Sequence, residues 1–221
     1  MPYRLPRPLT LKTTGCDGEI DAWYSNDAIT ICYEYLRYVL ETARSPDRPP
    51  WVSEHDAILG PVVDLFLHEG AHAVFEYFQV PVLGREEDAA DQVATYAMLH
   101  VHRDLAPRIL AGVTFAYLSE SGANAFSKLR RMKVGVVDAT KASDPHSLPL
   151  QRMYGVLCLA YGSDPVAYRE LADKGALPKE RAEGCEEEYR QVAFAFDKLL
   201  LPHIDQARLK DLFPAVGRRS K

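Results

Sequence analysis

The chain has 221 residues, of which 47 % are hydrophobic, and these values fit one globular domain with a large core. Its formal net charge of −5 offers no basic surface for nucleic acid or an anionic membrane, so we expect no nucleic-acid partner. No apolar run approaches the roughly 20 residues that cross a bilayer, so we expect no transmembrane segment.

The first part of the chain predicts a small antiparallel sheet. A proline-rich start, residues 1–8, is expected to be extended or loose. Three short β-like runs follow, separated by turn-forming residues, at 9–14, 19–24 and 28–32. The third run passes directly into a helical pattern that ends near Ser45.

The rest of the chain predicts mainly helices. Gly60 and Pro61 indicate the start of a helix that ends at Phe78. Further helical patterns lie at 86–102, 105–118, 124–132, 150–161, 164–175 and 186–200, the last strongly amphipathic and expected to contribute to the core. A short apolar run at 134–137 precedes a loop at 138–149 that is long enough to suspect a function. We therefore expect a single α+β domain over residues 1–221, mostly helical, with residues 215–221 frayed.

A metal-ligand motif lies in the helix expected at 61–78. His68 and His72 are four residues apart and therefore project from one helical face, with Glu69 beside them. This H-E-x-x-H spacing is typical of zinc peptidases, in which the histidines bind the ion and the glutamate is the general base. Chance is the alternative, but the motif interrupts a segment that otherwise has the pattern of a buried helix.

The next helix offers the third ligand that a catalytic zinc usually requires. Glu87 and Asp91 are four residues apart on one helical face, so Glu87 could bind zinc while Asp91 accepts the free N–H of a ligating histidine. Two alternatives remain open. The acidic residues could merely stabilise the helix N-terminus, and Glu86 or Asp88 could reach the ion in place of Glu87.

Other residues are candidates for supporting roles. The developing oxyanion of a hydrolysed amide needs a donor, for which we consider His146 first and then Arg152 and Tyr154. The alternatives are a solvated loop histidine, an ion-paired arginine and a core tyrosine. Asp64, one turn before His68, could support a ligand or be a surface acid.

The four cysteines suggest an oxidising location without proving it. Cys16, Cys32, Cys158 and Cys185 form no C-x-x-C motif, and their layout suggests a near pair at each end of the chain. Four cysteines allow three pairings, and four buried thiols in a cytosolic enzyme are the alternative. The start of the chain lacks the apolar run of a signal peptide, so a cytoplasmic location stays open.

The order of these motifs resembles a known class. H-E-x-x-H followed by E-x-x-x-D, here from His68 to Asp91, resembles the gluzincin pattern of zinc metallopeptidases. More closely, the chain resembles a family of bacterial metallopeptidases of unknown substrate, long catalogued as a domain of unknown function, over roughly residues 9–201. The matching stretches are 29–34, the helix that carries the motif, 82–91, 161–165, 177–178 and 181–185.

The resemblance implies a zincin-like fold and a role for each motif residue. His68, His72 and Glu87 would bind one zinc ion, Glu69 would be the general base, and Asp91 would contact His68. Members of the family are typically exported, so the resemblance also favours disulfides, Cys16 with Cys32 and Cys158 with Cys185, and a periplasmic or extracellular location.

The function that we expect is zinc-dependent hydrolysis of peptide bonds. The substrate would be a peptide or protein that adds a strand to the edge of the small sheet. Two imidazoles and a carboxylate suit zinc better than other divalent metals. The first alternative is a catalytically inactive metal-binding protein that recognises a protein partner, and the second is a purely structural role for the two histidines.

Overall fold

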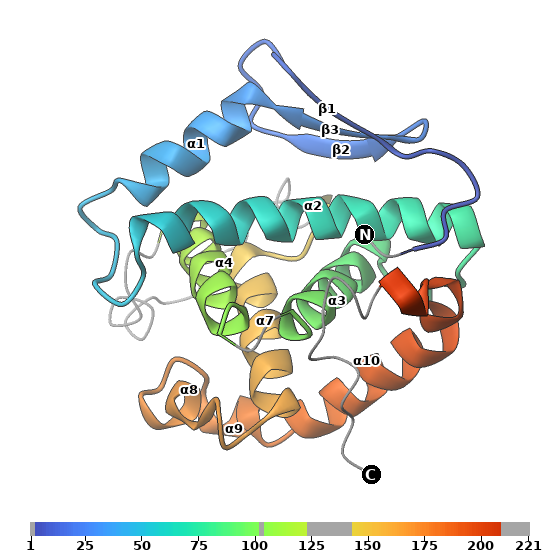
Figure 1. The fold of residues 1–221 in the computed structure, drawn as a ribbon. Coiled ribbons are helices and arrows are strands. Elements are labelled where there is room, and N and C mark those ends of the chain that lie inside the picture. Colours follow the sequence, from blue (N-terminus) through green and yellow to red (C-terminus); the bar gives the residue numbers. More distant parts are fainter. Residues whose placement is uncertain (1–2, 102–103, 123–142, 209–221) are drawn as a thin grey trace.

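The computed structural model describes residues 3–101, 104–122 and 143–208 (Figure 1). The helix expected at 124–132, the apolar run at 134–137 and the end of the chain at 215–221 lie outside these residues. The expected mostly helical α+β fold with a small N-terminal sheet is confirmed.

The sheet contains β1 (Thr10–Thr14), β2 (Ala22–Ser25) and β3 (Ala28–Cys32) in the order β1-β3-β2. β2 and β3 form the expected antiparallel hairpin, but β1 runs parallel to β3, so the prediction of a wholly antiparallel sheet was wrong. β3 takes the centre because it is the apolar strand, with Ile29 and Ile31 buried. A disulfide between Cys16 and Cys32 joins the carboxyl ends of β1 and β3, which requires the two strands to run in one direction.

The helix that carries the H-E-x-x-H motif is longer than expected. α1 (Tyr33–Ala43) follows β3 directly, as predicted, and α2 (Glu54–Phe78) then runs for 25 residues. Its N-cap is Ser53, whose hydroxyl accepts the Asp56 backbone N–H at 3.0 Å. Pro61 lies inside α2 rather than at its start, so this boundary was wrong: packing of α2 against the rest of the fold outweighs the single backbone hydrogen bond that proline removes.

The remaining helices form one body. They are α3 (Glu86–Leu99), α4 (Ala106–Glu120), α7 (Pro149–Ser163), α8 (Arg169–Asp173), α9 (Lys179–Ala182), α10 (Cys185–Leu199) and the 3-10 turn η1 (Leu201–His203). α8 is shorter than the helix expected at 164–175, because Asp164 caps a separate turn by accepting the Ala167 N–H. The apolar side of α10 is half-buried and contributes to the core as expected, with Phe196 and Leu199 packed against the cluster that contains Leu200.

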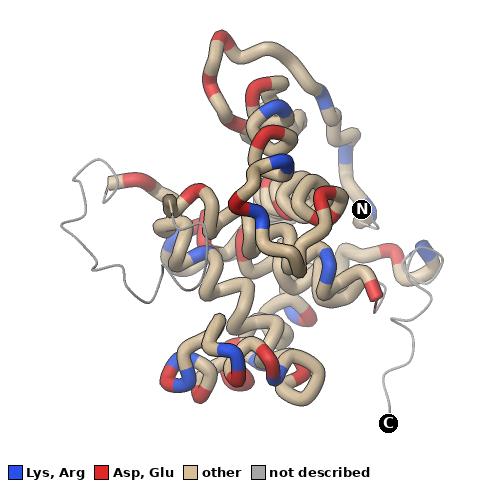
Figure 2. The backbone as a smooth tube through the Cα atoms, turned by 90° about the vertical axis from the view of Figure 1, so that its left-hand side faces the viewer, with Lys and Arg blue, Asp and Glu red and all other residues tan. Residues whose placement is uncertain are grey.

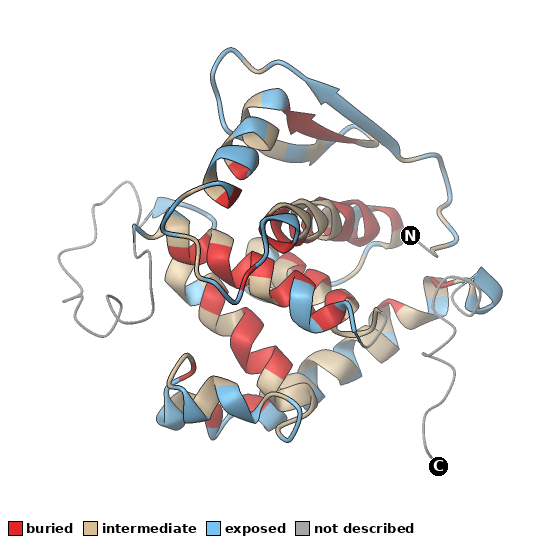
Figure 3. Cartoon of the chain, turned by 60° about the vertical axis from the view of Figure 1, so that its left-hand side comes forward, coloured by how far each residue is buried: buried red, intermediate tan, exposed pale blue. Residues whose placement is uncertain are grey.

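α2 separates two layers of the molecule. The sheet and α1 lie on one side of it, and α3, α4 and α7 lie on the other (Figure 1). Burial is concentrated in α2, α4, α7 and the central strand, whereas β1 and the short helices α8 and α9 are mostly exposed (Figure 3). The largest core cluster joins α3, α4 and α7 through residues such as Met98, Leu118 and Met153. α2 is thus held from both sides.

The cysteines pair as favoured, Cys16 with Cys32 and Cys158 with Cys185, the second bond joining α7 to α10. Two disulfides are compatible with an oxidising extracellular or periplasmic location. Among the described helices only α2 is long and apolar enough to cross a membrane, and 56 % of its apolar window is buried inside the fold. Length and composition are therefore weak evidence for a membrane span here.

Candidate metal centre

Two imidazoles meet on the C-terminal half of α2. His68 is buried and His72 lies one turn further along the same helical face, which places their Nε2 atoms 3.2 Å apart. Two ring nitrogens at this distance cannot both carry a proton without repulsion. The two Nε2 atoms are instead placed so that both lone pairs can bind one cation.

α3 brings a carboxylate to the same point. The start of α3 packs against α2 through the apolar residues Ala71, Phe75 and Ala90. As a result, the Oε2 atom of Glu87 lies 3.0 Å from His68 Nε2 and 3.4 Å from His72 Nε2. The second helix therefore completes a group of three ligand atoms.

The three atoms have the spacing of ligands around one zinc ion. Their separations are 3.2 Å between the two imidazole nitrogens and 3.0 and 3.4 Å from these to the carboxylate. Tetrahedral zinc with bonds of 2.0–2.1 Å separates its ligand atoms by roughly 3.3 Å. The donor set His68, His72 and Glu87 therefore fits a metal ion, although geometry alone does not identify the ion.

Each histidine is fixed by an acid on its other nitrogen. His68 Nδ1 lies 2.8 Å from Asp91 Oδ1, the contact that the sequence predicts. His72 Nδ1 lies 2.8 Å from Glu86 Oε1, a contact that the sequence did not predict. From the sequence, Glu86 is only a rival to Glu87, which is favoured because Asp91 lies four residues beyond it. In the structure both acids leave the Nε2 atoms free for the metal.

The electrostatics of the site favour a cation. Burial alone would lower the pKa of His68, but the bonds to Asp91 and Glu87 raise that pKa to about 9. The pKa of Glu87 is held far below its usual range, first by His146 and then by His68 and His72. In the metal-free protein, protons take the place that a metal would occupy, so metal binding must release them.

Glu69 lies beside the ligands and is not one of the three. It is buried, and burial raises the pKa of its carboxyl group, while the backbone of Tyr24 on β2 acts in the opposite direction. Glu69 faces a cavity of about 700 Å³ between the sheet and the metal centre. The cavity is lined by residues of β2 and Asp21 before it, of α2, of the segment before α3, of the start of α3 and of the loop before α7. They are Asp21–Tyr24, Glu69, His72, Phe75, Glu76, Val80, Val82, Glu86, Glu87 and His146.

His146 reaches this cavity from the loop before α7. Its Nε2 lies 2.8 Å from Glu87 Oε2, and its Nδ1 lies 3.1 Å from Asp144 Oδ1. The contact with Glu87 raises the pKa of His146. The structure therefore brings this sequence-predicted residue to the metal centre, while most of the loop that precedes it lies outside the described residues.

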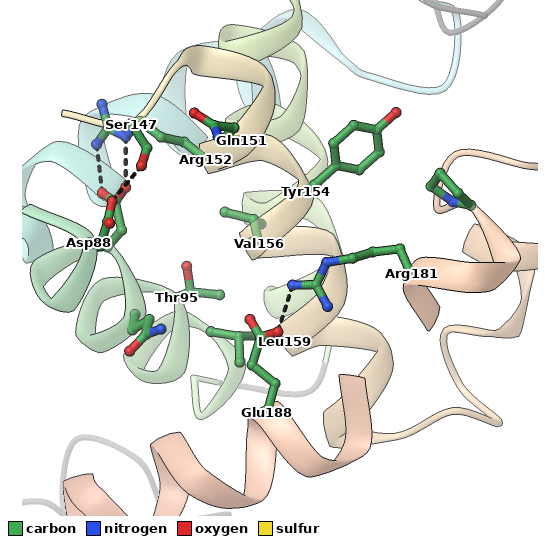
Figure 4. Close-up of a pocket in the computed structure, with 14 residues that line it drawn as sticks. Asp88, Thr95, Ser147, Gln151, Arg152, Tyr154, Val156, Leu159, Arg181 and Glu188 are labelled. Carbon is green, nitrogen blue, oxygen red and sulfur yellow. Dashed lines mark hydrogen bonds and ion pairs between the residues drawn. The ribbon is translucent and has the colours of Figure 1, made fainter. Parts of the chain in front are cut away.

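Arg152 and Tyr154 lie elsewhere. Arg152 forms two hydrogen bonds to Asp91, and neither side chain lines the cavity of the metal centre. Both line a second cavity of about 480 Å³ between α3, α7, α9 and α10, and their side chains point in different directions from α7 (Figure 4). The ion pair of Arg152 with Asp91 matches the alternative of an ion-paired arginine, and a role of either residue at an oxyanion stays a prediction.

Asp64 is a buried acid rather than a surface one. Its Oδ2 accepts the Tyr117 hydroxyl at 2.7 Å, and burial raises its pKa from 3.8 to about 6. It lies one turn before His68 on the side of α2 that faces the helical body.

Fold and site together define a class of protein: a mostly helical α+β domain with a candidate mononuclear metal centre that opens into a cavity. The family model described as "Putative metallopeptidase" matches residues 2–200, and the chain belongs to this family, as its motifs indicated. Neither the curated proteins nor the solved structures contain a match.

Proposed function

We propose that the protein is a zinc-dependent peptidase in which Glu69 is the general base. The observation that carries this proposal is the convergence of His68 Nε2, His72 Nε2 and Glu87 Oε2 at separations of 3.0–3.4 Å, with Glu69 beside them in a cavity. Membership of a metallopeptidase family supports it.

The chemistry divides between the ion and the chain. When bound, zinc would supply Lewis-acid polarisation of the scissile carbonyl and a water molecule with a pKa near roughly 7. Glu69 accepts the proton of that water and later gives it to the leaving amine. The raised pKa of Glu69 suits the first step, since a more basic carboxylate accepts the proton of the water more readily.

His146 is the residue that we assign to the developing oxyanion. Its Nε2 projects into the cavity beside Glu87, and its raised pKa favours a protonated ring that can donate. Asp144 holds the opposite ring nitrogen and orients the imidazole. Loss of this ring would then slow turnover more than it weakens metal binding.

The substrate is a peptide or protein bound along β2. β2 pairs only with β3 among the described strands, so its second edge has backbone groups that can pair with an extended peptide. Residues 21–24 of this edge line the same cavity as Glu69. The disulfides and the family support a place of action outside the cytoplasm.

Metal analysis is the first test. Protein purified without added metal would be measured by mass spectrometry, with His68→Ala, Glu87→Ala and Glu69→Gln beside it. His55→Ala is the matched control, because His55 is an exposed histidine near the start of the same helix. We expect about one zinc per chain in the native protein, in His55→Ala and in Glu69→Gln, and little in the two ligand variants.

Activity on a peptide library then distinguishes a peptidase from a metal-binding protein without catalytic activity. We expect turnover by the native protein and His55→Ala, and a loss of at least about 100-fold in Glu69→Gln despite its bound zinc. Zinc binding without turnover would favour the non-catalytic alternative, a metal-binding protein that recognises a partner. No zinc in the native protein, even after zinc is offered at neutral pH, would overturn both.

A further inference from the structure

Arg152 makes a bidentate contact that the proposed chemistry does not use. Its Nε donates to Asp91 Oδ2 at 2.7 Å, and its second terminal nitrogen donates to Asp91 Oδ1 at 2.6 Å. Both side chains are only 17 % exposed. Two parallel hydrogen bonds from a planar guanidinium fix the plane of a carboxylate, which a single bond cannot do.

The fixed carboxylate is the one that contacts a proposed ligand. Asp91 Oδ1 lies 2.8 Å from His68 Nδ1, so one oxygen is shared between the arginine and the imidazole. With the proton held on Nδ1, the Nε2 lone pair of His68 is directed at the metal position. Without the arginine, the carboxylate could rotate and the imidazole would lose its fixed orientation.

The guanidinium of Arg152 also stacks on an aromatic ring. Its carbon lies 4.7 Å from the centre of the Tyr117 ring, and the Tyr117 hydroxyl donates to the buried Asp64 at 2.7 Å. This aromatic face lies on α4, whereas Arg152 is on α7 and Asp91 is on α3. Three helices of the body thus meet at one charged group behind α2.

We propose that Arg152 is a positioning residue of the metal centre, which acts through Asp91 to hold His68 in the orientation that binds the ion. This inference rests on the proposed function, since it requires a metal at His68. It goes beyond charge balance: a lysine at this position would keep the positive charge but could not form the two parallel bonds.

The test compares two arginines that pair with buried or nearly buried acids. Arg152→Lys and Arg152→Met would be measured beside Arg108→Lys and Arg108→Met, because Arg108 binds the buried Asp56 of α2 far from the metal centre. The readouts are the zinc dissociation constant, from competition with a chromophoric chelator, and the unfolding midpoint of the metal-free protein.

We expect both Arg152 variants to bind zinc roughly 10- to 100-fold more weakly than the native protein, the size of effect typical for a partner of a metal ligand. The Arg108 variants should lower the unfolding midpoint and leave the zinc dissociation constant within twofold. Arg152→Lys covers the case in which Arg152→Met does not fold.

Two outcomes would overturn the inference, and they can be told apart. Zinc affinity within twofold of native in Arg152→Lys, in a protein that binds zinc, removes the role of Arg152 and leaves the peptidase proposal intact. A native protein that binds no zinc removes both.

Discussion

Asp64 is a buried acid near the metal centre whose charge depends on the fold. It is buried, its one described hydrogen-bond partner is the Tyr117 hydroxyl, and its pKa is raised from 3.8 to about 6, first by burial and then by the nearby charge of Asp91. The folded protein therefore holds this proton more strongly than the unfolded chain does.

This shift predicts how stability depends on pH. Relative to Asp64→Asn, the native protein should be most stable below about pH 4, lose that advantage as pH rises to about 6, and change little above it, a total of roughly 2 to 3 kcal/mol. The sign follows because a raised pKa stabilises the protonated folded state. Urea unfolding of both metal-free proteins between pH 4 and pH 7 measures it, and parallel pH curves would contradict it.

At the scale of residues, the sequence predicted which side chains share a helical face, and the family resemblance implied the contact of Asp91 with His68. His68, His72 and Glu69 follow from the helical repeat, and Glu87 and Asp91 follow from a second repeat. The contact of Glu86 with His72 depends on how α3 crosses α2, which no local pattern encodes. The roles in catalysis stay predictions.

At the scale of the elements, α2 and α4 pack closely, and their contact depends on two glycines. A Cβ atom on Gly112 would lie 1.9 Å from the Asp56 carbonyl oxygen, and one on Gly60 would lie 2.6 Å from the Ile109 carbonyl oxygen. Real side chains cannot approach backbone so closely. The backbones of α2 and α4 are therefore in direct contact in the N-terminal part of α2, before the metal ligands.

Gly112→Ala should consequently destabilise the fold by at least about 2 kcal/mol, because one of the two helices must move. Gly155→Ala is the matched control: Gly155 is also inside a helix, a Cβ atom there would meet no atom within 4 Å, and alanine should stabilise by up to about 1 kcal/mol. Urea unfolding measures both. Equal free energies of unfolding for the two variants would refute the close contact.

The same helix contact explains why one boundary could not be predicted. Gly60 followed by Pro61 has the local pattern of a helix start, but in the fold Gly60 allows α4 to approach and α2 continues through both residues. The direction of β1 could not be predicted from local patterns either, because the sequence of short strands and turns does not determine which strand lies at the centre of the sheet. Tertiary packing decided both.

At the scale of the whole molecule, one disulfide lies in the sheet and the other lies among the helices on the opposite side of α2. Cys16–Cys32 closes the sheet, and Cys158–Cys185 fastens α7, which carries Arg152, to α10. Three of the four cysteines are fully buried. The bonds therefore stabilise elements that contribute to both sides of α2.

We expect removal of the second disulfide, in Cys158→Ala with Cys185→Ala, to lower the free energy of unfolding by about 3 kcal/mol, because the unfolded chain gains freedom. The pair Cys16→Ala with Cys32→Ala should cost a similar amount. Thermal melting with and without a reducing agent provides the check: the native protein should lose stability on reduction, and a variant lacking all four cysteines should not respond. A native transition that ignores the reductant would show that the bonds do not form.

The start of the chain has a consequence for the cavity. Tyr3 pairs with Ile204 after α10, and Arg7 bonds both Asp27 in the β2–β3 turn and Glu76 near the end of α2. The sheet is therefore attached at both of its ends, once through α1 and once through this N-terminal segment. The position of β2 above the cavity therefore depends in part on Arg7, far in sequence from the metal ligands, and for the proposed peptidase the N-terminal segment would help to set the space available to a substrate.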